Sequence, residues 1–280
     1  MVFEQLYPVE FLRKHSFYGF LLGVGYTILG MFIALMIFRE DPALIAVGIT
    51  SLLLIPSLYN LSDASSFFKR GIDFRSFFRF SFSNVKIYVF IFFGIFFTFA
   101  FFSILLPSLA ANYLFNVQLS VVRGSAVSFS FSLFWDLFSW NLRVLLLAFL
   151  LSLIAGNGAI LFIAWNASVW GTIFGNLAKT AAVVSGGHPA IIFLLIILSV
   201  FPHTFLEGLS YILATVSGTA LSDGLVREKA FSRRMWLIFK YGFLLALISV
   251  GVLLVAGVVE TYVLNNFHTY RMIIELAFPR

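Results

Sequence analysis

Two ionisable side chains, His203 and Glu207, lie four residues apart in the most apolar part of the sequence. At this spacing two helical residues share one face. Between Val144 and Ser222 the only charged residues are Lys179 and Glu207. A charge inside a membrane-spanning segment costs about 2.5–3.5 kcal/mol on insertion, so it indicates a functional site. We therefore take His203 and Glu207 as the centre of a candidate pocket or proton relay.

Glu260 and Asn141 are predicted to lie at a similar depth to this pair. If one helix ends at Asp223 on the inner side, a rise of 1.5 Å per residue places His203 about 30 Å and Glu207 about 24 Å above that border. Counted in the same way from Lys240, at the inner start of the last span, Glu260 lies about 30 Å up. Asn141 begins the fourth predicted span on the outer side. We expect a polar pocket that opens near the outer face.

Each of these residues also has a simpler explanation. His203 follows Pro202 and could cap a helix that restarts there. Glu207 could pair with His203 for structural reasons alone. Glu260 could be an interfacial acid whose carboxylate reaches the membrane surface. A zinc site from one histidine and two glutamates is the least favoured reading, because there is no HExxH pattern and no second histidine close by.

Small residues accompany the polar ones. Helical steps from Glu207 reach Ser210, Ala214 and Gly218, so the polar face is also the face that permits close helix approach. A second small-residue series, Ala167, Gly171 and Gly175, occurs earlier in the chain. We predict that both faces point into the protein and not towards lipid.

The chain carries no recognisable catalytic or cofactor-binding motif. It has no cysteine, which excludes thiol catalysis and thiolate metal sites. It also lacks a GxSxG nucleophile turn and a GxxxxGK[ST] phosphate loop. We expect no catalytic residues, no bound metal, no cofactor and no nucleic-acid partner.

The composition identifies the class of protein that must position these residues. Of the 280 residues 61% are hydrophobic and 11% are charged, whereas soluble domains have about 45–50% and about 25%. These values exclude a disordered chain, a disulfide-stapled secreted domain and an ordinary soluble enzyme. We predict an all-α fold, a polytopic transmembrane helical bundle. The 37 phenylalanines are interpreted as apolar filling and interfacial anchoring.

Segments free of charged residues predict about six to seven spans. Single spans are expected within 15–38, 42–62, 87–109 and 241–259, and the stretch 142–222 has room for three. Gly156-Asn157-Gly158 and Pro202-His203 interrupt that stretch, so we predict broken helices in 142–222. Asn166 is expected towards the inner side unless residues 142–178 turn back.

Positively charged residues predict the orientation, because cytoplasmic loops are enriched in Lys and Arg. Twelve of the 18 cations fall before the first span, between the second and third spans, or before the last. We expect a multi-pass protein of the plasma membrane with a cytoplasmic N-terminus and an external C-terminus.

Three regions are predicted along the chain. Residues 1–140 form an N-terminal helical region of three spans, with a cytoplasmic amphipathic loop at 62–86 and an outer segment at 110–140. Residues 141–264 form a membrane core, and 265–280 form a C-terminal tail. Within the loop, 66–79 mixes phenylalanines with cations in the manner of an interfacial helix, although a solvated loop is the alternative.

The second half of the chain resembles the stage II sporulation protein M family of integral membrane proteins. The resemblance rests on Trp140-Asn141, Gly156 with Asn166 and Gly171, the segment Phe201-Pro202-His203-Thr204-Phe205-Leu206-Glu207, and Ala256 to Tyr262 around Glu260. It covers about 140–264. The chain departs from the family pattern where Thr204 replaces glycine and where Ala167 follows Asn166.

The resemblance implies a membrane component without established enzymatic activity. Sporulating members of the family act in a complex with cell-wall-degrading partners, a role that does not carry over to relatives from organisms that do not sporulate. The positions that match family motifs are Asn141, Asn166, His203, Glu207 and Glu260.

Three functions follow from these observations. The first is a non-enzymatic subunit or scaffold of a membrane complex, with the lipid bilayer, membrane or cell-envelope proteins and a second copy of the chain as partners. The second is a proton-linked transporter in which His203 and Glu207 carry protons, because interrupted hydrophobic stretches are typical of secondary transporters. The third, an intramembrane enzyme with Glu207 or His203 as general base, ranks last because no nucleophile is visible beside them.

Overall fold

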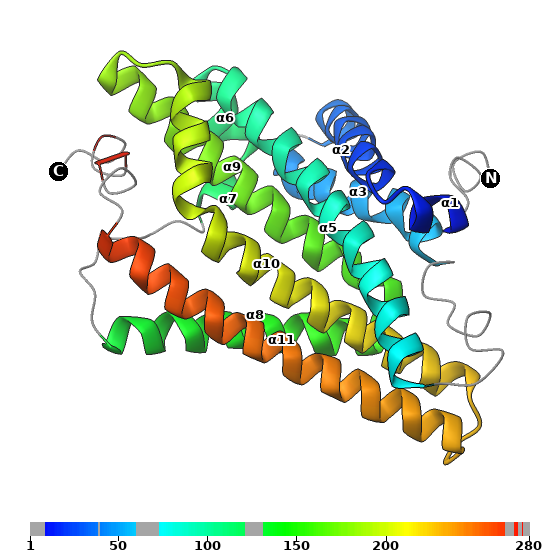
Figure 1. Ribbon diagram of the computed structural model, residues 1–280. Helices are drawn as coiled ribbons and strands as arrows, with labels where there is room; N and C mark the ends of the chain where they lie inside the picture. Colours follow the sequence, from blue (N-terminus) through cyan, green and yellow to red (C-terminus); the bar gives the residue numbers. More distant parts are fainter. Residues whose placement is uncertain are drawn as a thin grey trace.

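The computed structural model describes residues 9–38, 40–59, 73–120, 131–266, 272–273 and 276, and these are helical with short connections and no strand among them. Figure 1 shows long helices that run side by side between two ends of the molecule. The elements are α1 (Val9–Lys14), α2 (Tyr18–Ile37), α3 (Pro42–Tyr59), α5 (Phe74–Leu105), α6 (Ser108–Leu114), α7 (Asn116–Ser120), α8 (Phe131–Ala155), the 3₁₀ turn η2 (Gly156–Ala159), α9 (Ile160–Ser185), α10 (Pro189–Arg227) and α11 (Arg233–Asn266).

The predicted all-α, multi-pass class is confirmed. Within the described residues, five segments are long and apolar enough to cross a membrane: Tyr18–Ile37, Phe74–Leu105, Phe134–Ser185, Pro189–Arg227 and Arg233–Val263. Pro42–Leu58 is a shorter apolar helix. The 52-residue segment Phe134–Ser185 contains both α8 and α9. The helices therefore fit the predicted number of spans.

The chain turns back between α8 and α9, where the sequence predicts an interruption. Gly156 has a φ of +54°, a left-handed conformation that glycine adopts without steric cost. The turn continues through η2, and α9 leaves it in a different direction from α8 (Figure 1). The Thr219 hydroxyl of α10 donates a hydrogen bond to the Gly156 carbonyl at 3.4 Å, which fixes the turn against the C-terminal half of α10.

The second predicted interruption is wrong. Helix α10 runs without a break through Pro202 for 39 residues. Proline lacks a backbone N–H and its ring clashes with the preceding turn, so it bends a helix that it does not end. Figure 1 shows α10 changing direction between its first turns and the remainder. Neighbouring helices make such a proline tolerable inside a membrane bundle.

Several helix boundaries also differ from the sequence-based expectation. Helix α5 begins at Phe74, well before the window that starts at 87, and α11 begins at Arg233 instead of near 241. Asn141 lies inside α8 and not at its start. Residues 62–72 of the predicted loop 62–86 and residues 121–130 of the predicted outer segment 110–140 lie outside the described residues.

The start of α5 is capped and packed against other helices. The Asp73 side chain accepts a hydrogen bond from the Ser76 hydroxyl, and this bond lowers the pKa of the Asp73 carboxyl below its ordinary value. Phe77 and Phe80 are buried in a cluster with Leu221 of α10 and Ile238 of α11. These turns of α5 are thus packed on protein instead of lying alone on a membrane surface.

The cations of three separate segments gather at this same end of the bundle. The guanidinium of Arg13 in α1 lies 4.9 Å from the centre of the Phe80 ring in α5. Phe77 contacts Tyr241 of α11, with ring centres 5.7 Å apart. Figure 1 shows α1, the start of α5 and the turn between α10 and α11 at one end. We refer to it as the cationic end; the described cations near it are Arg13, Lys14, Arg75, Arg79, Arg227, Lys229, Arg233, Arg234 and Lys240.

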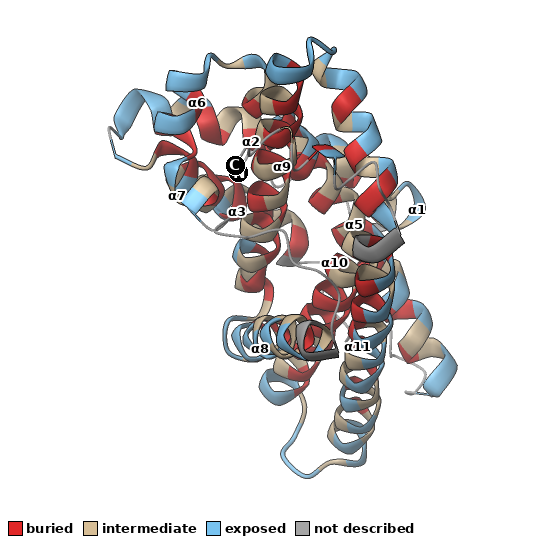
Figure 2. Cartoon of the chain, turned by 90° about the vertical axis from the view of Figure 1, so that its left-hand side faces the viewer, coloured by how far each residue is buried: buried red, intermediate tan, exposed pale blue. Residues whose placement is uncertain are grey.

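Close helix approach through small residues holds the core together, as predicted. A Cβ atom on Gly171 of α9 would overlap the Phe96 carbonyl of α5, and one on Gly175 would lie 2.7 Å from the Ala100 carbonyl oxygen. A Cβ atom on Gly218 of α10 would lie 2.6 Å from the Phe149 carbonyl oxygen of α8. Both small-residue faces therefore point into the protein. Figure 2 shows buried residues concentrated where the long helices meet.

Candidate functional site

The candidate site is built on one stripe of α10, where the polar side chains of His203, Glu207 and Tyr211 follow one another at single helical turns. The Tyr211 hydroxyl donates a hydrogen bond to Oε1 of Glu207 at 2.8 Å. Tyr211 is only 3% exposed. Among the described residues no hydrogen bond joins His203 to Glu207, so the predicted structural pair is replaced by a Glu207–Tyr211 pair.

His203 occupies the interior of α10 and not a helix start. The predicted capping role is therefore wrong, because α10 is continuous on both sides of this residue. The side chain is 7% exposed, and within the described chain its Nδ1 atom has no hydrogen-bond partner. A buried polar atom without a partner costs free energy, which is tolerated where the atom has a function.

Glu260 joins the site from α11. Its charge acts on both Glu207 and Tyr211, so the structure brings the two carboxyl groups within electrostatic range of each other. Glu260 lies six residues before the end of α11 at Asn266, in the half of the bundle opposite the cationic end. Two carboxyl groups and a phenol at this position can hold a proton or a cation between two helices.

Asn141 lies on the face of α8 that points to this site. Phe138 and Leu145, three residues before and four residues after it, belong to one buried cluster with Tyr211. Residues at these spacings share a helix face. Since α8 and α10 run in the same direction (Figure 1), one turn outward from Leu145 places Asn141 near the level of Glu207. Asn141 is half-buried there.

Asn166 also faces α10. It lies between Phe162, whose ring centre is 6.0 Å from that of Tyr211, and Trp170, whose ring would lie 3.3 Å from a Cβ atom on Gly208. Its Nδ2 atom donates to the Phe162 carbonyl at 2.8 Å. Asn166 was expected towards the inner side unless residues 142–178 turn back. The chain does turn back at η2, so that expectation no longer applies.

Tyr211 is the site residue that sequence reasoning missed. It lies one turn beyond Glu207, and the spacing that joins His203 to Glu207 would have reached it. Within the described residues, His203, Glu207 and Glu260 do not form a group of three side chains arranged to hold a metal ion. The arrangement is therefore a hydrogen bond within α10, from Tyr211 to Glu207, with the carboxyl group of Glu260 in α11 within electrostatic range and two asparagines from α8 and α9 nearby.

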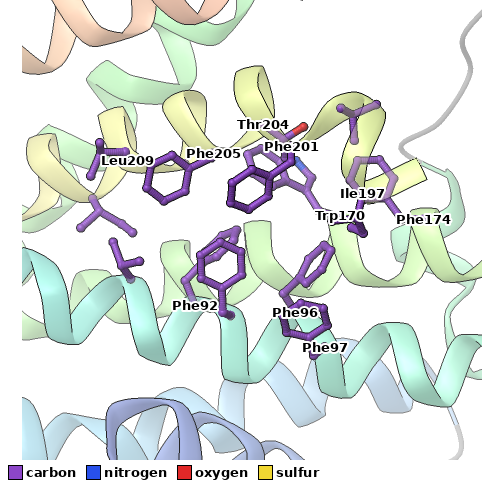
Figure 3. Close-up of a pocket in the computed structure, with 15 residues that line it drawn as sticks. Phe92, Phe96, Phe97, Trp170, Phe174, Ile197, Phe201, Thr204, Phe205 and Leu209 are labelled. Carbon is purple, nitrogen blue, oxygen red and sulfur yellow. The ribbon is translucent and has the colours of Figure 1, made fainter. Parts of the chain in front are cut away.

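A second feature occupies the opposite side of α10, where aromatic rings line a partly open apolar cavity of about 40 Å³ between α5, α9 and α10 (Figure 3). Its wall on α5 includes Phe92, Phe96 and Phe97, and its wall on α10 includes Phe201 and Phe205. From the sequence alone these phenylalanines are interpreted only as apolar filling and interfacial anchoring. We call this cavity the aromatic groove.

The comparisons with known proteins agree with the membrane core. A family model described as Stage II sporulation protein M matches residues 87–263. The match starts earlier than the 140 indicated by the motifs, so the family region includes most of α5. No curated protein and no solved structure matches the chain.

Proposed function

Because the chain belongs to the Stage II sporulation protein M family of integral membrane proteins, we propose that it is a non-enzymatic subunit or scaffold of a membrane complex. The observation that carries this proposal is the backbone-to-backbone packing at Gly171, Gly175 and Gly218. These contacts tie α5 to α9 and α8 to α10. Helices joined so closely cannot slide past one another without separating, so the core suits a rigid platform better than a pair of moving halves.

Hydrogen bonds between helices support the same function. Ser103 of α5 donates to the Thr172 carbonyl of α9 at 2.9 Å. Ser217 of α10 donates to the Gly242 carbonyl of α11 at 2.7 Å. Each bond satisfies a polar group that lipid could not satisfy. The polar residues at these positions therefore strengthen the platform.

The proposed orientation has the N-terminus and the cationic end in the cytoplasm of a cell bounded by the plasma membrane. Cytoplasmic enrichment of Lys and Arg is the physical basis. The site around Glu207 and Glu260 then faces the outer half of the bilayer, where it forms a polar pocket for an envelope or membrane partner.

The complex is tested by purification of the affinity-tagged chain from cross-linked native membranes in several mild detergents. A partner, a further copy of the chain or another protein, recovered at constant stoichiometry supports the proposal. Recovery of the monomeric chain by itself in every detergent contradicts it. Glu207→Gln tests whether the polar pocket contributes to partner binding, and Glu40→Gln, a change at an exposed position between α2 and α3, is the matched control.

The orientation is tested with single cysteines, since the natural chain has none. Ala230→Cys probes the exposed turn between α10 and α11, and Ser185→Cys probes the exposed end of α9. A membrane-impermeant thiol reagent added to intact cells is expected to label Ser185→Cys alone. Labelling of Ala230→Cys alone would reverse the orientation.

Proton-linked transport is the second candidate, favoured by the intramembrane group Glu207, Tyr211 and Glu260. A carboxyl pair held between two helices can exchange protons with a pathway across the membrane. In proteoliposomes with an imposed pH gradient, transport predicts a proton flux that Glu207→Gln removes and Glu40→Gln leaves unchanged. Proton flux equal to that of empty liposomes would rule this candidate out.

A further inference from the structure

The aromatic groove lies on the face of α10 opposite the polar site. Trp170 and Phe174 of α9 form its floor, while α5 and α10 form its walls (Figure 3). Along α10 the lining extends from Ile197 to Ile212, a length of about 22 Å at 1.5 Å per residue. The groove therefore follows the direction of the spans.

The lining is apolar along its whole length. Thr204 is the one lining residue with a hydroxyl group, and none carries a charge. One hydroxyl group gives ordered water too few polar partners, and no charged side chain is present to bind a headgroup. The groove can accept a hydrocarbon chain.

The groove opens onto the surface that faces lipid. Phe97 on one wall is 40% exposed and Phe201 on the other is 42% exposed. Both lie on segments long and apolar enough to span a membrane. The mouth of the groove is thus continuous with the lipid-facing surface of the bundle.

Packing explains why the groove exists between α5 and α10. Small residues bring α9 close to α5, whereas aromatic rings keep α5 and α10 apart. The ring of Phe93 stacks on those of Phe201 and Phe205, with centres 6.1 and 6.3 Å apart. Pro202 bends α10 next to these rings, so the two helices cannot close along their full length.

We propose that the aromatic groove binds a single acyl chain of a bilayer phospholipid. Its apolar lining, its direction along the spans and its continuity with the lipid-facing surface select this occupant. The absence of charge in the lining means that the chain is bound and the headgroup is not recognised. This inference does not depend on the proposed scaffold function.

Trp170 allows a direct test, because its side chain lies in the groove. A protein that keeps Trp170 and has its other four tryptophans changed to phenylalanine is reconstituted with phospholipids brominated on the acyl chain, which quench tryptophan on contact. A protein that keeps only Trp140, which is 65% exposed on α8 next to Asn141, reports contact with bulk lipid. The lipids carry either a neutral or an anionic headgroup.

Gly208→Leu fills the groove beside Trp170, where a Cβ atom would lie 3.3 Å from the ring. Gly251→Leu is the matched control, since a Cβ atom there meets nothing within 4 Å. We expect strong quenching of Trp170 with both headgroups, reduced to about half or less by Gly208→Leu because leucine occupies the space of the chain. Gly251→Leu should leave the quenching of Trp170 unchanged.

Three results would overturn the proposal. Trp170 that stays unquenched while Trp140 is quenched would show that the groove is closed or holds another protein segment. Quenching unaffected by Gly208→Leu would show contact outside the groove. An isoprenoid lipid recovered with the protein, which phospholipid fails to displace, would replace the acyl chain as occupant. Circular dichroism and gel filtration of each variant establish that it is folded.

Discussion

The two faces of α10 pack against their surroundings in opposite ways. On one face His203, Glu207 and Tyr211 lie near Gly218, and the helix approaches its neighbours closely. On the other face large rings such as Phe205 hold α10 away from α5 and leave the aromatic groove. The same helix is thus tightly packed on one side and open on the other.

The difference follows from side-chain size and polarity. A polar group in hydrocarbon must find a partner within hydrogen-bond distance, which requires neighbouring helices to approach closely. Aromatic side chains need no such partner, and lipid can complete their packing. The close face is therefore expected to be sensitive to added volume and the open face to be tolerant of it.

The largest effect is expected from leucine at the two glycines that represent these faces. At Gly218 a side chain would overlap Ser152 and lie 2.6 Å from the Phe149 carbonyl oxygen, so Gly218→Leu should cost more than about 4 kcal/mol or prevent folding. Gly208→Leu enters the groove, where its Cβ atom lies 3.3 Å from the Trp170 ring, and should cost about 1–3 kcal/mol, the usual range for overpacking. Unfolding in detergent, followed by circular dichroism, measures both.

Gly251→Leu provides the reference for leucine at a helical glycine without neighbours within 4 Å. Equal losses of stability at Gly218 and Gly208 would contradict the distinction between a close and an open face.

A smaller effect is expected when the polar contact is removed. Tyr211→Phe leaves the half-buried Glu207 carboxyl without its 2.8 Å donor, which should lower the free energy of unfolding by about 1–3 kcal/mol. Phe205→Leu on the open face changes only apolar volume and should cost less than about 1.5 kcal/mol. Both values come from the same unfolding measurement. If Tyr211→Phe proves neutral, the Glu207–Tyr211 bond does not stabilise the fold.

Pro202→Ala tests whether the bend in α10 keeps the groove open. With the backbone N–H restored, α10 should straighten, and the distance between spin labels at Ala190→Cys and Val226→Cys should lengthen towards the roughly 54 Å of a straight helix. Pulsed electron paramagnetic resonance measures this distance. Leu206→Ala, which leaves Pro202 in place, should retain the shorter distance. An unchanged distribution in Pro202→Ala would assign the bend to the neighbouring helices instead.

The smallest effect concerns Asp73, at the start of the helix that forms the other wall of the groove. The Ser76 hydrogen bond lowers the pKa of the Asp73 carboxyl below its ordinary value of 3.8. The folded helix end therefore gains stability above pH 3.8 and loses it as the pH falls through the folded pKa. Asp73→Asn should remove this dependence.

Hydrogen exchange of the first turn of α5, corrected for the intrinsic rate at each pH, measures this local change. Glu40→Gln provides the control for an acid outside the helix end. A pH dependence that persists in Asp73→Asn would assign it to another group.

Much of the molecule could be predicted because apolar length and charge position are properties of the chain itself. The turn at Gly156 follows from two nearby glycines, and the inward face at Gly171 follows from small residues at helical spacing. The continuity of α10 through Pro202 could not be predicted. A proline removes one hydrogen bond from a helix, and whether the helix bends or ends depends on the helices around it.

The same distinction holds at the site. The sequence by itself determined the helical membrane class, the family, and the face of α10 that carries His203 and Glu207, because spacing along one helix decides which side chains share a face. Tertiary structure alone decided that Glu260 approaches from α11, that Tyr211 binds Glu207, and that the phenylalanines line a groove. Contacts between separate helices depend on their crossing and register, which no periodicity within a single helix specifies.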